Sequence, residues 1–415
     1  MLTAMAGFVI SWIIIHHGRF TVGHMIDTPI YAHYAGMMKR GLVPYRNFFE
    51  MYPPLALPVF FLPALFAGAS FATYTHLFQL EMLVFGMASV GLAAFVLVDQ
   101  RPELRRLIAG VGIGALMPVL MGSVILSRYD LWPTALTVAA LVALWLGSNR
   151  TGFALLGLGF AAKAFPVVIL PIAFIYVWRS EGRRRALGCL GVFLVAVLAW
   201  FLPFVIASPH GVWASITNQS GRPLQIESLG AAIWLFAHQV TGMHLLHTYF
   251  THGSDNLDGH PELHFARLMS VVQPIVIAGV SVVYALGKPT RERLLVAATA
   301  AVCAFIIFDP VLSPQYLIWL VPLVMMVPGR RGLAAILLLA ASMALTQVWF
   351  PQHYPLLKQF LPLESWAVIA RDLVLLVLFG TLAWPDVAIW REMRRAISRL
   401  TSTSKVAPVP RFDEA

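Results

Sequence analysis

Long runs of apolar residues alternate with short polar segments along almost the whole chain. A helix of about 20 apolar residues can cross the hydrocarbon core of a bilayer, and shorter runs suit tilted or broken helices. The pattern predicts about 12 transmembrane helices. They are expected at 2–18, 72–98, 107–126, 131–147, 152–162, 165–178, 186–207, 264–287, 293–308, 315–328, 332–349 and 365–384. The two short runs on either side of Lys163 predict broken or tilted helices.

Two further apolar stretches, 54–70 and 228–241, are long enough either to cross or to lie at the membrane surface. Cytoplasmic loops of membrane proteins carry an excess of Lys and Arg. If neither stretch crosses and the N-terminus is inside, every basic cluster faces the cytoplasm. If both cross, eight arginines in the loops 99–106, 148–150 and 179–185 move outside. We therefore expect both stretches to be juxtamembrane or re-entrant helices on the external side.

Composition supports a membrane protein. The chain has 415 residues, is 59% hydrophobic and only 12% charged, whereas an ordinary soluble domain has about 25% charged residues. The net charge of +10 comes from clusters at the ends of apolar runs, which suit anionic lipid head groups and not nucleic acid. We expect a multi-pass protein of the plasma membrane.

The predicted organisation is one all-α integral membrane domain over residues 1–400. It has a first external loop at 18–71 and a long external segment at 208–263. The polar tail 401–415 is expected to be disordered and cytoplasmic. Cys189 and Cys303 lie inside apolar runs, which is typical of packed membrane residues.

The first external loop is unusually polar and aromatic for so apolar a chain. Residues 28–40 predict a helix, with Pro29 in its first turn and Gly41 after its end. Tyr31, Tyr34 and Met38 share one face, as expected for an amphipathic helix at the level of the lipid head groups.

Asp27 directly precedes this helix, and two interpretations of it stand. As a helix N-cap it would accept a bond from the first turn. As a carboxylate at the membrane interface beside apolar surface, it has the setting of a base or a cation ligand.

Five segments resemble a known family of membrane enzymes. They are DTPIYAHYAGMMKRGLVPYRNFFEMYPPLA (27–56), SRYDLWPTAL (127–136), GLGFAAKAFPVVILP (157–171), QSGRPLQIESLGAA (219–232) and SPQYLIWLVPL (313–323). Together and in this order they resemble glycosyltransferase family 87, formerly a domain of unknown function, among the polyprenyl-phosphate-dependent glycosyltransferases of the GT-C fold class. Beyond residue 325 the resemblance is limited to hydropathy.

The resemblance implies an inverting glycosyl transfer on the external leaflet, within cell-envelope glycolipid biosynthesis. The donor would be a polyprenyl-phosphate sugar, with mannose as the family default, and the acceptor a lipid or glycan. The resemblance makes Asp27 the general base. It implies no obligate cofactor, although a divalent cation held loosely at the phosphate is compatible with it.

Such a reaction needs a carboxylate beside the acceptor hydroxyl and cations beside the departing phosphate. Arg128, Lys163 and Arg222 are the candidate cations, because all three are external in the predicted topology. Two structural alternatives stand beside this interpretation. Lys163 could snorkel to the interface, and Arg128 could pair locally with Asp130.

Other polar and aromatic residues of the external segments are candidate sugar or acceptor contacts. They are Tyr31, Tyr34, Arg46, Glu50, Tyr52, Gln225, Glu227, Gln315 and Tyr316. Here too structural alternatives stand: Glu227 could cap the helix after it, turn formation accounts for Asp309, and Asp372 could pair with the adjacent Arg371. The histidine spacing does not indicate a structural metal site.

Two other function classes compete with a glycosyltransferase. A secondary transporter or lipid flippase would place ionisable residues near the bilayer midplane, often within repeated halves. Here the polar residues cluster in external segments, and the sequence contains no convincing repeat. A membrane scaffold without catalytic activity would not need a carboxylate and cations converging on one face.

Overall fold

The computed structural model describes residues 1–17, 25–219, 221–242 and 246–385. Within this part, the long helices are α4 (Phe71–Asp99), α5 (Leu104–Met121), α10 (Arg183–Ala207), α13 (His260–Leu286), α16 (Gly329–Trp349) and α18 (Pro362–Ala383). All six are long and apolar enough to cross a membrane. The predicted class, a helical multi-pass membrane protein, is confirmed.

Shorter helices complete the bundle. They are α1 (Leu2–Ile14), α6 (Val124–Ser127), α7 (Leu131–Trp145), α8 (Asn149–Ala162), η3 (Phe165–Ile169), α9 (Leu170–Glu181), α14 (Arg291–Ile307), η4 (Pro314–Tyr316) and α15 (Leu317–Met326). Every predicted span is therefore helical over most of its length. The run 107–126 breaks at Gly122, where φ is +61°, and Lys163 separates α8 from η3.

Helix α15 lies at the centre of the molecule. All of its residues from Leu317 to Met326 are buried, and α4, α5, α7, α14 and α16 pack around it. Its 10 residues are too few to cross a bilayer alone, but a short helix is tolerated where protein covers it. Arg106 of α5 closes its C-terminal end by donating to the carbonyl oxygens of Val324, Met325 and Val327.

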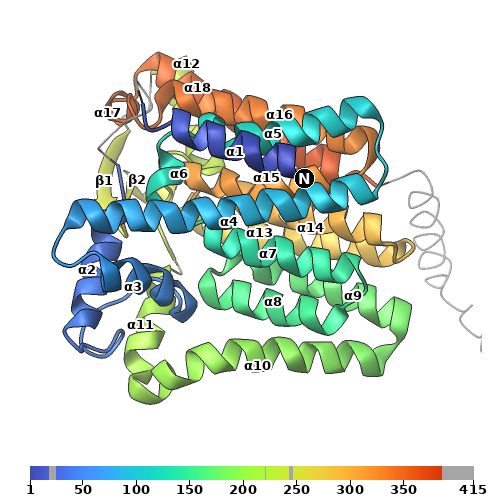
Figure 1. Ribbon diagram of the computed structural model, residues 1–415. Helices are drawn as coiled ribbons and strands as arrows, with labels where there is room; N and C mark the ends of the chain where they lie inside the picture. Colours follow the sequence, from blue (N-terminus) through green and yellow to red (C-terminus); the bar gives the residue numbers. More distant parts are fainter. Residues whose placement is uncertain (18–24, 220, 243–245, 386–415) are drawn as a thin grey trace, which may run out of the picture.

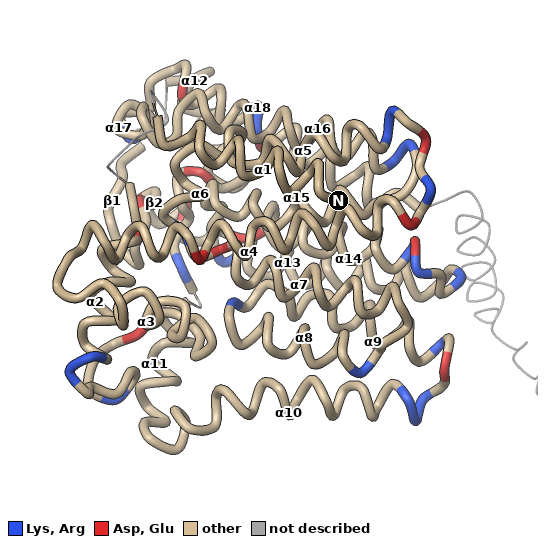
Figure 2. Tube along the Cα trace, in the orientation of Figure 1, with Lys and Arg blue, Asp and Glu red and all other residues tan. Residues whose placement is uncertain are grey.

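The two ends of the bundle differ in charge and in structure. Lys and Arg gather around the loops that join α4 to α5, α9 to α10 and α13 to α14 (Figure 2), and we call this the basic end. The opposite end, which we call the hairpin end, carries the remaining elements (Figure 1). These are α2 (Thr28–Lys39), η2 (Pro54–Ala56), α3 (Leu57–Phe66), α11 (Pro209–Gln219), α12 (Leu229–Thr241), α17 (Tyr354–Leu357), β1 (His247–Thr251) and β2 (Ser254–Asp258).

The stretch 54–70 forms η2 followed by α3, and the stretch 228–241 forms α12. Helix α3 has 10 residues and α12 has 13, so neither is long enough to cross alone. Helix α3 packs on α2 and α4, and α12 packs on α18.

A β-hairpin in the segment 208–263 is an element that the sequence interpretation did not predict. Strands β1 and β2 pair antiparallel with Thr248 opposite Leu257 and Thr251 opposite Ser254. His252 and Gly253 form the turn with φ of +53° and +74°, which is the two-residue geometry that matches the twist of the strands.

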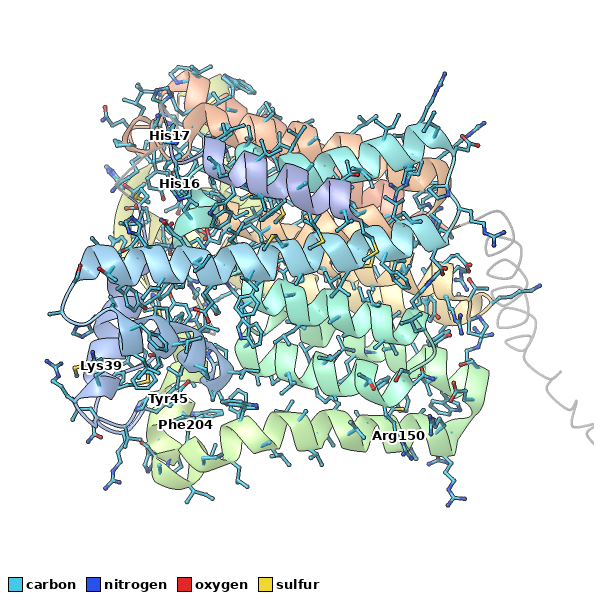
Figure 3. The ribbon with its side chains drawn as sticks, in the orientation of Figure 1. His16, His17, Lys39, Tyr45, Arg150 and Phe204 are labelled. Atoms are coloured by element: carbon cyan, nitrogen blue, oxygen red, sulfur yellow. The ribbon has the colours of Figure 1, made fainter. Side chains whose placement is uncertain are left out.

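Contacts with α10 and α11 hold the first loop against the bundle. Tyr45 packs edge-on against Phe204 of α10, with ring centroids 5.3 Å apart (Figure 3). Ser208 Oγ donates to the carbonyl oxygen of Tyr45 over 3.0 Å. Gly211 makes this approach possible, since a Cβ at that position would lie 1.8 Å from the same oxygen. The tail 401–415 lies outside the described residues.

Candidate active site

A partly buried ion pair between Asp27 and Arg128 lies at the hairpin end. The carboxylate of Asp27 contacts the guanidinium of Arg128, and their side chains are 21% and 10% exposed. The hydroxyl of Tyr31 donates to Asp27 Oδ2 over 3.4 Å. Asp27 occupies the N-cap position of α2, but its side chain makes no capping bond. Its carboxylate is therefore directed at the bundle and not at its own helix.

Packing of α2 sets this direction. Pro29 lies in the first turn of α2, and the ring of Tyr31 stacks on Phe60 of α3 with centroids 4.3 Å apart. Tyr31 is 1% and Tyr34 7% exposed. The expectation that these rings sit among lipid head groups is therefore wrong, because α3 covers Tyr31, and Phe48 and Tyr52 of the same loop cover Tyr34.

Both terminal nitrogens of the Arg128 guanidinium have partners, Nη1 in Asp27 and Nη2 in Met25. Its Nη2 donates to the carbonyl oxygen of Met25 over 3.0 Å, while its buried Nε has no hydrogen-bond partner among the described residues. The alternative of a local pair with Asp130 is wrong. Arg128 is in extended conformation at the end of α6, which sends its side chain to Asp27.

Asp130 instead forms a second buried ion pair, with Lys163. Lys163 Nζ lies 2.7 Å from Asp130 Oδ1, and Trp319 Nε1 donates to the same oxygen over 2.6 Å. The ammonium also lies over the rings of Tyr129 and Trp319, 4.7 and 5.2 Å from their centroids. Lys163 therefore does not snorkel to the interface, because a carboxylate and aromatic faces inside the protein compensate its charge.

An aromatic cluster packs beside the two ion pairs. Tyr31, Tyr52, Phe60 and Tyr129 contact one another largely edge to face, with Tyr52 and Tyr129 5.2 Å apart. Glu50 lies behind this cluster and is fully buried. Its Oε1 accepts from the backbone N–H of Tyr52 over 3.0 Å, and burial raises the pKa of Glu50 to about 8.

Arg222 lies against the hairpin. Its Nη2 donates to the carbonyl oxygen of His252 over 3.0 Å and to Ser254 Oγ over 2.8 Å. Lys163 Nζ lies 5.6 Å from the ring centroid of Tyr316, whereas Arg222 contacts the hairpin. The three candidate cations therefore do not form one contiguous cluster.

Glu227 and Gln225 form a buried polar group beside Tyr316. Gln225 Nε2 donates to Glu227 Oε2 over 3.2 Å and to Ser313 Oγ over 3.1 Å. Ser228, not Glu227, caps α12 by accepting from the N–H of Ala231. The alternative of a Glu227 cap is therefore wrong, and burial raises the pKa of Glu227 to about 8.

The remaining sequence candidates are more peripheral or structural. Asp309 accepts from the N–H of Val311 over 2.8 Å, which confirms its role in the turn. Arg371 Nε lies 2.6 Å from Asp372 Oδ1, which confirms the local pair. Arg46 is exposed, so the structure does not bring it into the buried cluster, and Gln315 is half-buried.

Sequence reasoning missed the partners that complete the site. Trp319, Tyr129 and Tyr354 did not enter the candidate set, and Asp130 entered only as a local partner of Arg128. Tyr129 and Asp130 directly follow Arg128 in SRYD, so their place beside a candidate cation was a usable signal. Among the described residues, no group of three or more His, Cys, Asp or Glu side chains could hold a metal ion.

Comparisons with known proteins find similarity in structure but not in sequence. No family model and no curated protein sequence matches the chain. The structure is similar to the crystal structure of ArnT from Cupriavidus metallidurans bound to undecaprenyl phosphate. The TM-score is 0.49 at 14% sequence identity, over 98% of this chain and 81% of that one.

Proposed function

We propose that the protein is an inverting glycosyltransferase that moves a sugar from a polyprenyl phosphate to a lipid or glycan acceptor. The observation that carries the proposal is the partly buried Asp27–Arg128 pair at the hairpin end, with the Lys163–Asp130 pair nearby. Such a site offers a base together with cations, which transfer from a lipid phosphate requires. Mannose is the proposed sugar, on the strength of the family resemblance alone.

The proposed reaction is one displacement at the anomeric carbon. Asp27 takes the proton of the acceptor hydroxyl while its oxygen forms a bond to that carbon. The bond from the same carbon to the phosphate oxygen breaks, and polyprenyl phosphate leaves with the electron pair. Cations stabilise the charge that develops on this oxygen.

Arg128 is the proposed phosphate ligand. The planar guanidinium suits a phosphate through paired hydrogen bonds. In the structure Arg128 is held by Asp27 and Met25, and its buried Nε has no hydrogen-bond partner within the described part of the chain. A phosphate that draws Arg128 away would leave Asp27 unpaired and able to accept a proton. Lys163 is proposed to contribute positive charge from its fixed place beside Asp130.

The proposed orientation puts the basic end in the cytoplasm and the hairpin end outside. The gathering of Lys and Arg at one end of the bundle supports this arrangement. The active site would then face the external leaflet of the plasma membrane, where a lipid-linked donor needs no nucleotide.

The test uses the purified full-length protein with polyprenyl-phosphate-mannose and a lipid extract as acceptor. We expect Asp27→Asn to lower turnover by about 100-fold or more, as for loss of a general base. Asp258→Asn, which changes an exposed carboxylate of β2, serves as the matched control. Wild-type turnover by Asp27→Asn would remove Asp27 from the mechanism. Passage of the lipid across vesicles without a glycosylated product would favour the flippase alternative.

A further inference from the structure

A cavity with several polar side chains in its wall lies at the hairpin end, outside the residues assigned to the proposed reaction. It has a volume of about 440 Å³ and is lined by Met25, Thr248, Asp255, Tyr354, Lys358 and Gln359, among others. Small-molecule sites commonly measure about 300–1,000 Å³. The cavity is therefore large enough for a sugar unit.

The charges in the cavity wall favour a neutral ligand. Asp255 is 5% exposed, and its Oδ1 lies 2.8 Å from Lys358 Nζ. Tyr354 also lines this wall, where burial and then the nearby carboxylates of Glu227 and Asp255 raise the pKa of its hydroxyl. The negative charge of Asp255 and the positive charge of Lys358 compensate each other, so the wall carries no net charge that would select an anion. It does offer acceptors and donors together, which is what a ligand rich in hydroxyl groups requires.

The cavity adjoins the Asp27–Arg128 pair. Met25 lines it, and the carbonyl oxygen of Met25 accepts from Arg128 Nη2 over 3.0 Å. Met25 also precedes Asp27 by only two positions. On the inner side, Tyr354 lies close to the carboxylate of Glu227 as well as to that of Asp255. A ligand in the cavity would therefore lie next to the proposed base.

We propose that this cavity binds the sugar unit of the acceptor, with Asp255, Lys358 and Gln359 contacting its hydroxyl groups. The inference rests on the proposed function, because it names where the acceptor of that reaction is held. In this arrangement the hairpin supplies part of the cavity wall. Thr248 and Asp255 lie on the same face of the two-stranded sheet, since Thr248 pairs with Leu257 and side chains alternate along a strand.

The same alternation supplies a matched pair of probes for a binding experiment. Thr248→Cys places a thiol in the cavity wall, and Tyr249→Cys places one on the opposite face of β1. Cys189 and Cys303 are buried, so they leave a low background of labelling. The rate of maleimide labelling is measured with the full-length protein in detergent. The ligands are methyl glycosides of mannose, glucose, galactose and arabinose, as mono- and disaccharides, with glycerol as the control polyol.

We expect at least one glycoside to slow labelling of Thr248→Cys by about fivefold at saturation, as for a site mostly occupied by ligand. Labelling of Tyr249→Cys should not change. Asp255→Asn in the Thr248→Cys background should remove the protection. Lys358→Gln changes a side chain that is 40% exposed and repeats this test if Asp255→Asn does not fold.

Absence of protection by every glycoside would overturn the inference, as would equal protection of Tyr249→Cys. Protection that survives both Asp255→Asn and Lys358→Gln would overturn the assigned contacts. Labelling requires no glycosyl transfer, so its outcome is separate from that of Asp27→Asn. An active Asp27→Asn enzyme with a protected Thr248→Cys would defeat the proposed mechanism and leave the cavity assignment standing.

Discussion

The carboxylate of Asp27 contacts the guanidinium of Arg128, although one residue precedes α2 and the other follows α6. This pair joins the first loop to the centre of the bundle. It also brings the proposed base and the proposed phosphate ligand into direct contact. In the absence of a donor each compensates the charge of the other, so binding of a phosphate and release of the base would be one event.

Replacement of Arg128 tests this exchange. We expect Arg128→Gln to raise the KM for the polyprenyl-phosphate donor by about 10- to 100-fold, since one charge-assisted hydrogen bond contributes about 1.5–3 kcal/mol. Arg128→Lys should give an intermediate KM, because it keeps the charge and loses the planar fork. Arg40→Gln removes an exposed arginine of the same end and should leave the KM unchanged. An unchanged KM in Arg128→Gln would show that Arg128 does not bind the donor.

The Lys163–Asp130 pair gives a prediction about stability. Loss of one member of a buried ion pair strands the other charge and costs about 3–5 kcal/mol. Asp130 is 1% and Lys163 18% exposed at the side chain, so Lys163→Met should lower the midpoint of thermal unfolding markedly. The double variant Lys163→Met/Asp130→Asn should recover most of this loss. If the two single effects simply add in the double variant, the residues are not coupled.

Glu50 gives a prediction about pH. Burial raises the pKa of Glu50 to about 8 in the folded protein, whereas an unfolded glutamate ionises near its ordinary value of about 4.3. Between these values the folded state holds a proton that the unfolded state has lost. Stability contributed by Glu50 is thus fully present below the unfolded pKa and is lost as pH rises toward about 8.

The measurement compares wild type with Glu50→Gln, which mimics the protonated acid. The melting temperature of Glu50→Gln minus that of the wild type should grow as pH rises from about 5 to 8, since each unit of pKa difference corresponds to about 1.4 kcal/mol. Glu103→Gln changes an exposed acid at the basic end and should give a difference that does not vary with pH. A constant difference for Glu50→Gln would mean that Glu50 is ionised in the folded state.

The proposed orientation is tested in intact cells with a membrane-impermeant maleimide. Arg105→Cys lies at the exposed start of α5, at the basic end, and should be labelled only after the membrane is opened. Phe250→Cys, at a position that is 71% exposed in β1, should be labelled from outside. Labelling of Arg105→Cys in intact cells would reverse the topology and place the site in the cytoplasm.

Much of the helical framework could be predicted, because backbone groups in hydrocarbon must bond within their own segment. Apolar runs therefore became helices, from α4 to α18, with ends within a few residues of those expected. The β-hairpin was missed because HTYFT and SDNLD lack a clear alternation of apolar and polar residues. The adjacent His252-Gly253 was the one local signal for its turn.

The sequence by itself determined which segments are apolar enough to enter a membrane, where the basic loops lie, and that Asp27, Arg128 and Lys163 are unusual in such surroundings. Tertiary structure alone decided their partners. Arg128 pairs with Asp27 and not with the nearby Asp130, and Asp130 instead contacts Lys163 and Trp319. A buried charge needs an opposite charge beside it in the folded protein. Which residue supplies that charge depends on how the helices pack, and a local sequence pattern does not contain this information.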